Sequence, residues 1–303
     1  MKLLQFIENG NIKLGIKTNQ GILDVAMAAD LLMLSSYKGI DIHDVIEGGE
    51  ERLARLADLA ERALSHPESA RLLLDENGLE WASCVTRPGK IICIGLNYRK
   101  HALETGQPTP QYPILFNKFN NTLHAHLKPV SLPKVSAKVD YEAELGVVIG
   151  KRAKYLDAKN ALDCVFGYCC ANDLSARDLQ LRTSQWLLGK CCDGFSPVGP
   201  YLVTSDEVGD PNQLAIRCAV NGEIRQQSNT ADMIFSVAEI VSYISQHMTL
   251  FPGDVIFTGT PEGVVLGYPP MEQVYLQPGD VVTVEIEKLG ALTNRMAAEC
   301  EKA

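Results

Sequence analysis

Apolar and polar positions alternate in short runs over the first 35 residues. Leu3–Ile7, Lys13–Thr18 and Ile22–Val25 have the length and pattern that predict β-strands. Asn9-Gly10 between the first two runs is a strong hairpin signal, and Asn19-Gln20-Gly21 between the next two is a weaker one. The chain is therefore predicted to begin with three short strands joined by tight turns.

The pattern changes to that of a helix from about Asp44 to Leu74. Leucines recur there at helix-like spacing among Glu and Arg residues, at Leu53, Leu56, Leu59 and Leu64. Together, these strands and this helix predict a small N-terminal β/α domain over residues 1–85.

The remainder, residues 86–303, is predicted to be a larger domain rich in strands. After the turn residues Arg87-Pro88-Gly89, the apolar run Lys90–Gly95 predicts a buried strand. Further apolar runs between turn signals predict strands at Ala143–Ile149, Val165–Ala171, Leu214–Val220, Asp254–Thr258 and Val281–Ile286.

Two local signals complete this outline. Asn221-Gly222 marks a further hairpin. A helix is predicted from about Ser236 to Met248, because Ser236 can cap it and Glu239 stands three residues later. The predicted fold class is α+β with a majority of strands.

Charge and composition narrow the classes of function. The formal net charge is −9, from 28 basic and 37 acidic residues, so the chain should repel nucleic acids and anionic membrane surfaces. No apolar run is long enough to span a membrane, and the apolar stretch before Glu8 is too short for a signal peptide. We therefore expect a cytoplasmic protein, and any anionic substrate needs a site made positive by a metal or by Lys and Arg.

Cysteine usage indicates reduced thiols. The chain has nine cysteines, with neighbouring pairs at Cys169–Cys170 and Cys191–Cys192. Adjacent cysteines rarely bridge each other, and no C-x-x-C spacing suggests zinc.

Carboxylates placed for a metal are the most informative feature. Glu142 and Glu144 stand two apart at the start of an apolar strand, so they point to the same side. Asp173 follows the next predicted strand and could join them. Hard cations such as Mg²⁺ and Mn²⁺ prefer oxygen ligands of this kind. The alternative is a solvated pair of glutamates, with Asp173 capping a helix that starts near Leu174.

A histidine and a glutamate form a second cluster. If Asn97–Glu104 is helical, His101 and Glu104 lie on one face, and the carboxylate can orient the imidazole as a general base. The alternative is a surface ion pair.

Cationic and amide side chains form a third cluster. Helical spacing would place Asp173, Arg177 and Gln180 on one face, and Lys190 follows a short apolar run. Arg and Lys at these positions could bind the carboxylate of an organic acid. The alternative is ordinary helix salt bridges.

Taken in order, these clusters resemble the fumarylacetoacetate hydrolase family. The resemblance is closest to the branch with acylpyruvate hydrolases, oxaloacetate decarboxylases and the 2-hydroxyhepta-2,4-diene-1,7-dioate isomerases of homoprotocatechuate catabolism. Six stretches carry it: IGLNYRKHALETG (94–106), DYEAELGVVIGK (140–151), GYCCANDLSARDLQ (167–180), WLLGKCCDGFSPVGP (186–200), VNGEIRQQSNTADMIFS (220–236) and FPGDVIFTGTPEGV (251–264).

The resemblance implies a mixed β-roll catalytic domain behind a small N-terminal domain, in a homodimer. It implies that Mg²⁺ or Mn²⁺ is the cofactor. The residue roles that it implies are a metal site of Glu142, Glu144 and Asp173, a His101–Glu104 dyad on a mobile lid, a catalytic Lys190, and substrate contacts from Arg177, Gln180 and Thr260.

The implied function is Mg²⁺-dependent cleavage of a carbon–carbon bond in a small 2-oxo acid, such as an acylpyruvate or oxaloacetate, through a metal-stabilised enolate. In decarboxylation, Lys190 is the expected proton source. One alternative is a keto–enol isomerase/decarboxylase of homoprotocatechuate catabolism. A more remote alternative is a non-catalytic interaction protein on the same fold.

One segment departs from the family pattern. Relatives usually carry a glycine-containing turn after the stretch that corresponds to Pro113–Lys118, whereas Asn121–Leu127 follows here. His124 and His126 in this segment are expected to share a strand face and could be mistaken for metal ligands. The hard-oxygen site is expected elsewhere.

Overall fold

The N-terminal strands form as predicted. A computed structural model describes residues 1–37 and 39–299. Its first strands are β1 (Lys2–Glu8), β2 (Asn11–Thr18) and β3 (Gly21–Asp24). Asn9 and Gly10 between β1 and β2 have φ of 50° and 76°, the conformation that an Asn-Gly hairpin turn requires. The hairpin signals in the sequence are therefore confirmed.

The predicted N-terminal helix is shorter than expected. Helix α2 spans Ile42–Ser65 and does not reach Leu74. The residue before a proline avoids the helical region, so Pro67 stops the helix at His66, which is extended with ψ of 142°. Gly49 also interrupts α2, with φ of 55° and ψ of −141°.

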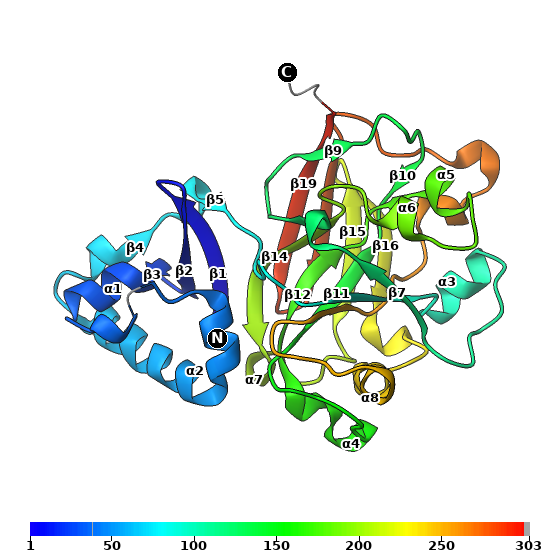
Figure 1. Cartoon of the computed structure of the whole chain (residues 1–303). Helices are drawn as coiled ribbons and strands as arrows, with labels where there is room; N and C mark the ends of the chain where they lie inside the picture. The colour runs from blue at the N-terminus through cyan, green and yellow to red at the C-terminus, as the bar shows by residue number, and fades with distance from the viewer. Residues whose placement is uncertain (38, 300–303) are drawn as a thin grey trace.

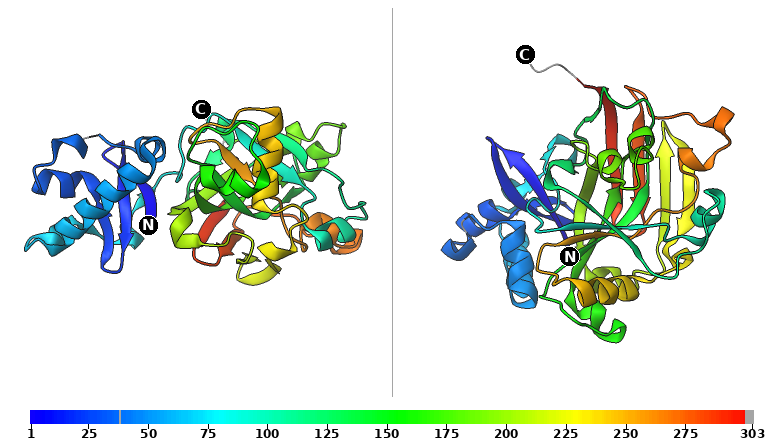
Figure 2. Two further views of the ribbon diagram at one scale, coloured as in Figure 1. Left: turned by 90° about the horizontal axis from the view of Figure 1, so that it is seen from below. Right: turned by 45° about the vertical axis from the view of Figure 1, so that its right-hand side comes forward.

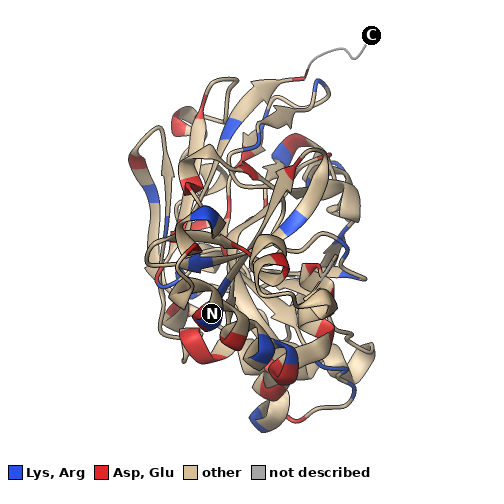
Figure 3. Ribbon diagram, turned by 90° about the vertical axis from the view of Figure 1, so that its left-hand side faces the viewer, with Lys and Arg blue, Asp and Glu red and all other residues tan. Residues whose placement is uncertain are grey.

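Helix α2 carries its charges on the outside. Asp44 and Asp41 form a capping box at its start, and the i,i+4 ion pairs Arg55–Glu51 (2.5 Å) and Arg62–Asp58 (3.2 Å) lie on its exposed face. Acidic and basic residues are accordingly interspersed on this side of the molecule (Figure 3).

The other elements follow in chain order. The remaining strands are β4 (Leu73–Leu74), β5 (Glu80–Trp81), β6 (Ile91–Gly95), β7 (Ile114–Lys118), β8 (Leu123–His124), β9 (Val130–Leu132), β10 (Val139–Asp140), β11 (Ala143–Ile149), β12 (Val165–Asn172), β13 (Ser175–Ala176), β14 (Ser196–Thr204), β15 (Ala215–Val220), β16 (Glu223–Asn229), β17 (Val255–Phe257), β18 (Val281–Ile286) and β19 (Gly290–Ala298). The remaining α-helices are α1 (Val25–Leu31), α3 (Arg99–Glu104), α4 (Ala158–Ala161), α5 (Arg177–Gln180), α6 (Leu187–Lys190), α7 (Ser205–Val208) and α8 (Val237–His247). The 3-10 turns are η1 (Ser35–Tyr37), η2 (Ser69–Leu72), η3 (Glu76–Gly78), η4 (Asn120–Thr122), η5 (Leu162–Cys164), η6 (Thr230–Asp232), η7 (Val265–Gly267) and η8 (Pro270–Glu272).

The predicted strands of the larger part and its one long helix are confirmed. Asn221-Gly222 joins β15 to β16. Helix α8 begins after Ser236, whose hydroxyl accepts a hydrogen bond from the Glu239 amide (3.3 Å) while the Glu239 carboxylate accepts one from the Ser236 amide (2.8 Å). Local signals therefore fix these turns and caps.

One mixed sheet runs through most of the molecule. Its strand order is β4-β3-β2-β1-β14-β12-β11-β17-β6-β7, and β16-β15-β18-β19-β9 form a second sheet. Strand β1 pairs with β14 through Lys2↔Val203 and Leu3↔Leu202, so the N-terminal strands extend the sheet of the larger part. Figures 1 and 2 show the N-terminal elements in blue beside the larger part. The domain division at residue 85 stays a prediction.

The centre of the first sheet positions the candidate site. Every residue of β11 and β12 is buried, and the two strands are antiparallel with Ala143 opposite Asn172. Strand β17 pairs with β11 on its other side. The start of β11 therefore lies beside the end of β12, which is where the acidic residues stand. None of the helices in the described part of the chain is long and apolar enough to cross a membrane.

We predict that Gly167→Ala destabilises the fold by about 1–3 kcal/mol, the usual cost of overpacking. A Cβ at Gly167 on β12 would collide with the carbonyl oxygen of Val203 and lie 2.9 Å from its carbonyl carbon. Thermal unfolding measures the effect. Gly78→Ala is the matched control, because a Cβ there meets nothing within 4 Å. Equal melting temperatures for the two variants would contradict the close approach of β12 and β14.

Candidate active site and metal centre

Three carboxylates meet at the ends of neighbouring strands. Glu142 immediately precedes β11, Glu144 is its second residue, and Asp173 follows β12. All three are buried, and one oxygen from each lies within 4.8 Å of the others. The predicted proximity of these residues is confirmed, whereas their role as metal ligands stays a prediction.

Protein cations neutralise two of the three carboxylates. Lys190 Nζ donates to Glu142 Oε2 and Asp173 Oδ2, both at 2.7 Å. Lys118 Nζ donates to Asp173 Oδ1 at 2.5 Å, and Arg177 Nη2 lies 2.7 Å from Glu142 Oε1. Burial alone would raise the pKa of Glu142, but Lys190 and Arg177 outweigh it and lower that pKa to about 2.

Glu144 has no such partner. The Gly259 amide donates to its Oε2 at 2.6 Å, and no lysine or arginine of the described residues pairs with it. Burial, and then the charges of Asp173 and Glu142, raise the pKa of Glu144 well above its ordinary value. A divalent cation would supply the missing positive charge. The all-oxygen donor set therefore fits Mg²⁺ or Mn²⁺.

The predicted histidine–glutamate pair forms on helix α3. His101 Nδ1 lies 2.8 Å from Glu104 Oε1, and His101 is 6% exposed. Because Nδ1 is engaged by Glu104, Nε2 is the ring nitrogen available to a substrate. Glu104 Oε2 also accepts a hydrogen bond from the Gly263 amide at 2.9 Å, which fixes the pair against the loop after β17. Closure of this segment as a lid stays a prediction.

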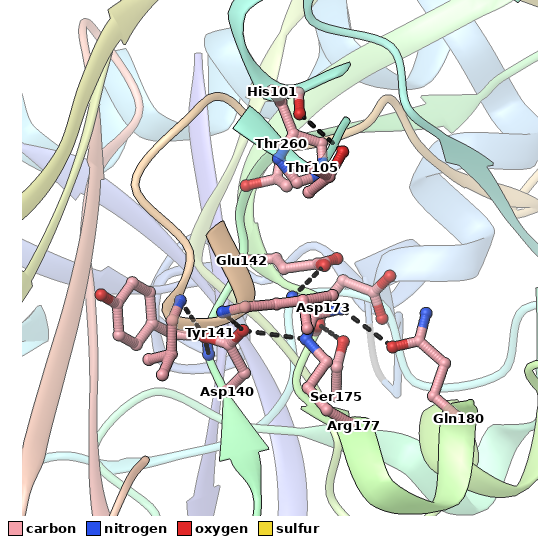
Figure 4. A network of polar contacts seen from close by, with 12 residues as sticks. His101, Thr105, Asp140, Tyr141, Glu142, Asp173, Ser175, Arg177, Gln180 and Thr260 are labelled. Carbon is pink, nitrogen blue, oxygen red and sulfur yellow. Dashed lines mark hydrogen bonds and ion pairs between the residues drawn. The ribbon is translucent and has the colours of Figure 1, made fainter. Parts of the chain in front are cut away.

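The three sequence clusters share one cavity of about 760 Å³. Its lining includes eight of the nine predicted site residues: His101, Glu104, Glu142, Glu144, Arg177, Gln180, Lys190 and Thr260. Figure 4 shows His101 and Thr260 on one side of the site and Glu142, Asp173 and Arg177 on the other. Asp173 is fully buried behind this lining, in contact with Lys190.

The third cluster comes together differently from the prediction. Asp173, Arg177 and Gln180 do not share one helix, because β13 (Ser175–Ala176) follows Asp173 and α5 is a single turn that begins at Arg177. The helical spacing predicted from the sequence is therefore wrong, and so is the alternative of Asp173 as a helix cap. Strand β13 instead pairs with β10, Asp140 lying opposite Ser175, and this pairing brings Arg177 to the site.

Two buried charges of the site were missed. Lys118 ends the stretch Pro113–Lys118, whose match to the family was the available signal. Asp140 accepts a hydrogen bond from Arg177 Nε at 2.8 Å, and it stands two residues before Glu142 in the same acidic stretch. The alternation of Asp140, Glu142 and Glu144 could have pointed to it.

The loop between Gly259 and Gly267 is held by site carboxylates. Glu144 binds its Gly259 amide and Glu104 its Gly263 amide. Asp140 accepts hydrogen bonds from the Val265 and Leu266 amides at 2.9 and 3.1 Å. One loop therefore ties together the carboxylate cluster, the histidine pair and the arginine.

The two extra histidines have structural contacts. His124 Nε2 lies 2.9 Å from the Pro129 carbonyl, and His126 Nδ1 accepts from the Thr293 amide at 3.0 Å. Strand β8 ends at His124, so the predicted shared strand face is wrong. Neither residue lines the site cavity, in keeping with the expected oxygen site elsewhere.

The cysteine thiols form no disulfide among the described residues. The eight cysteines in the described part of the chain are free, as predicted, and Cys300 lies outside the described residues. Cys191 and Cys192 are half-buried, and burial raises the pKa of both thiols.

Comparison with known proteins identifies the family to which the chain belongs. A family model described as fumarylacetoacetate (FAA) hydrolase C-terminal matches residues 90–297, and the chain belongs to this family. It is an enzyme of the fumarylacetoacetate hydrolase family with the predicted strand-rich α+β fold.

Individual relatives are similar over most of their length. The chain is 45% identical over 250 residues to "Oxaloacetate tautomerase fahd2, mitochondrial" of Xenopus laevis. The aligned region covers 80% of this chain and 77% of that protein. The crystal structure of a putative HpcE protein from Mycobacterium smegmatis has a TM-score of 0.81 and 34% identity, covering 99% of this chain and 100% of that one. That of maleylpyruvate hydrolase from Sphingobium sp. SYK-6, in complex with manganese(II) ion and pyruvate, has a TM-score of 0.77 and 28% identity at the same coverage. The frog relative is named as mitochondrial, and the cytoplasmic location of this chain stays a prediction.

We predict opposite effects of Glu144→Gln with and without metal. Without metal at neutral pH, the variant should melt above the wild type, because it avoids the cost of burying an acidic group beside Glu142 and Asp173. Mn²⁺ at a hundredfold excess over its dissociation constant should add about 2.7 kcal/mol to the wild type and much less to the variant. Glu61→Gln on the exposed face of α2 is the control. An equal Mn²⁺ shift in all three proteins would place the cation elsewhere.

We also predict an acid-sensitive contact at His126. Burial lowers the pKa of His126 from 6.5 to about 4, so the unfolded chain binds this proton first. Its contribution to stability is therefore complete above pH 6.5 and is lost as the pH falls through about 4. His126→Asn keeps an acceptor for the Thr293 amide and should remove ~2 kcal/mol of that pH dependence. Urea unfolding between pH 7.5 and 4.5 measures it, with His247→Asn as an exposed control that should follow the wild type.

Proposed function

We propose that this enzyme interconverts the keto and enol forms of a small 2-oxo acid, such as oxaloacetate, with Mg²⁺ or Mn²⁺ bound by Glu142, Glu144 and Asp173. The observation that carries the proposal is the meeting of this acidic cluster and the His101–Glu104 pair in one cavity. The frog relative, named as an oxaloacetate tautomerase, supports the choice of substrate. When bound, the cation would act as a Lewis acid on the 2-oxo group.

Two uncharged donors are oriented to bind the substrate. Arg177 Nη1 donates to Gln180 Oε1 at 2.9 Å, and a guanidinium can only donate, so the Gln180 amide nitrogen is left for a ligand. Thr260 Oγ1 accepts from Gln226 Nε2 at 2.9 Å, so its own proton can be donated.

All three side-chain nitrogens of Arg177 face partners within the protein, namely Asp140, Glu142 and Gln180. We therefore assign Arg177 to positioning these partners rather than to clamping a substrate carboxylate.

His101 is the proton carrier of the proposed reaction. In the keto-to-enol direction, Nε2 takes a proton from C3, and the Glu104 carboxylate stabilises the imidazolium that results. The imidazolium then gives this proton to the oxygen at C2, so the enol forms and His101 returns to its neutral state. The reverse direction returns the proton to C3. Because His101 is almost fully covered, its contact with bulk solvent is limited.

Lys190 is better suited to hold charge than to give up a proton. Burial alone would lower the pKa of Lys190, but Asp173 and Glu142 outweigh it and raise that pKa. The sequence-based expectation was a proton donor. We now assign Lys190 a fixed positive charge that offsets the carboxylates around it.

Carbon–carbon bond cleavage is the second candidate, and the His101–Glu104 pair also favours it. His101 could activate water for attack on an acylpyruvate, and decarboxylation of oxaloacetate would need no water. Similarity to maleylpyruvate hydrolase supports hydrolysis, and similarity to a 2-hydroxyhepta-2,4-diene-1,7-dioate isomerase supports a larger isomerase substrate. The homodimer expected from the family resemblance stays a prediction, which sedimentation velocity would test.

We predict that His101→Gln lowers tautomerisation of oxaloacetate by about 10²–10⁴-fold, the usual scale for a lost general base. Ultraviolet absorbance of the enol follows the rate, with the rate of Mn²⁺ alone subtracted. The Mn²⁺-dependent rise in melting temperature should survive, because His101 is not in the carboxylate cluster. His247→Gln on α8 is the matched control. If His101→Gln keeps the wild-type tautomerase rate but loses acylpyruvate hydrolysis, the second candidate is the correct function.

A further inference from the structure

The cavity is larger than its proposed substrate needs. Its volume of about 760 Å³ falls within the range of roughly 300–1,000 Å³ that is typical of sites for drug-sized ligands. Oxaloacetate is far smaller than a drug-sized ligand, so it leaves much of this volume unfilled. The remaining space must be explained by another part of a ligand or by water.

Lysine and arginine reach this cavity only at its base. Among the described residues that line it, the lysines and arginines are Lys190 and Arg177, and both are paired with buried carboxylates. A second carboxylate farther along a ligand would therefore meet no unpaired lysine or arginine among these residues. Burying an unpaired carboxylate is costly, so an extended diacid is disfavoured.

An apolar wall adjoins this base, because Lys190 Nζ lies 5.0 Å from the centroid of the Phe116 ring. It is formed by Phe116, Leu181, Trp186, Leu266, Tyr268 and Pro269. The Trp186 ring packs edge-on against Phe116, with 5.4 Å between ring centroids. A Cβ at Gly95 would lie 2.7 Å from Trp186 Cζ3, so the glycine gives the indole its place. Leu181 at the same wall is 59% exposed.

We propose that this wall is a subsite for an uncharged apolar or aromatic group attached beyond C3 of the 2-oxo acid, and that Trp186 is its main contact. The site then prefers an aryl-substituted 2-oxo acid over the same acid with a distal carboxylate. The inference rests on the proposed function, because the base must hold the 2-oxo acid for the substituent to reach the wall. Apolar burial and aromatic contact supply the preference.

A matched pair of ligands tests the subsite. Phenylpyruvate and its analogue with a carboxylate at the para position differ only at the far end. With Mn²⁺ present, calorimetry gives the dissociation constant of each ligand, and absorbance gives the tautomerisation rate. We expect phenylpyruvate to bind at least about tenfold more tightly, a difference of about 1.4 kcal/mol. Equal affinities would overturn the proposal.

Two variants locate the effect. Leu181→Lys adds a cation at the wall and should reduce or reverse the preference by improving binding of the para-carboxylate ligand. Ile224→Lys is the control, because Ile224 is similarly exposed (50%) but lies on β16 and does not line the cavity. If both variants change the preference equally, overall charge is responsible and the subsite is wrong.

Trp186 variants separate contact from folding. Trp186→Ala should weaken binding of phenylpyruvate about tenfold more than it weakens binding of oxaloacetate, and Trp186→Phe should restore most of the affinity for phenylpyruvate. Equal losses for both substrates would assign Trp186 to the base and overturn the proposal. If the ligand preference holds but neither acid is tautomerised, the subsite stands and the proposed reaction fails.

Discussion

The burial of three carboxylates within 4.8 Å of one another is the constraint on which the site depends. Each charge loses its hydration inside the protein, and each repels the other two. Lys118, Lys190 and Arg177 come from three different segments to offset Glu142 and Asp173, and Glu144 is left with a backbone amide. The divalent cation proposed for this site would offset the negative charge that remains.

This electrostatic centre also organises the rest of the site. The loop after β17 would otherwise carry a row of unsatisfied amides, and the carboxylates of Glu144, Glu104 and Asp140 accept hydrogen bonds from them. The candidate metal ligand, the histidine partner and the support of Arg177 thus share one backbone segment. Substitutions at these residues are expected to have coupled effects on stability, because contacts within one network are not additive.

The fold by itself leaves the reaction open. Similar chains and structures are named as a tautomerase, an isomerase and a hydrolase. Function lies in the groups placed on the scaffold. In the function proposed for this chain, the charged and polar residues of the cavity would hold the 2-oxo acid, and the apolar residues around Trp186 would contact the group at its other end.

Local features of the sequence determined much of the secondary structure and named most of the site. The period of two in β11, the Asn-Gly turns and the Ser236–Glu239 cap act between near neighbours, and six ordered motifs identified the family and the carboxylates. Only the tertiary structure decided that Lys118 and Asp140 belong to the site, that the pairing of β10 with β13 brings Arg177 there, and that β1 joins β14. Local patterns report which face of an element is buried. The partner of a charge depends instead on how segments far apart in the chain pack together, as for Lys118 and Asp173.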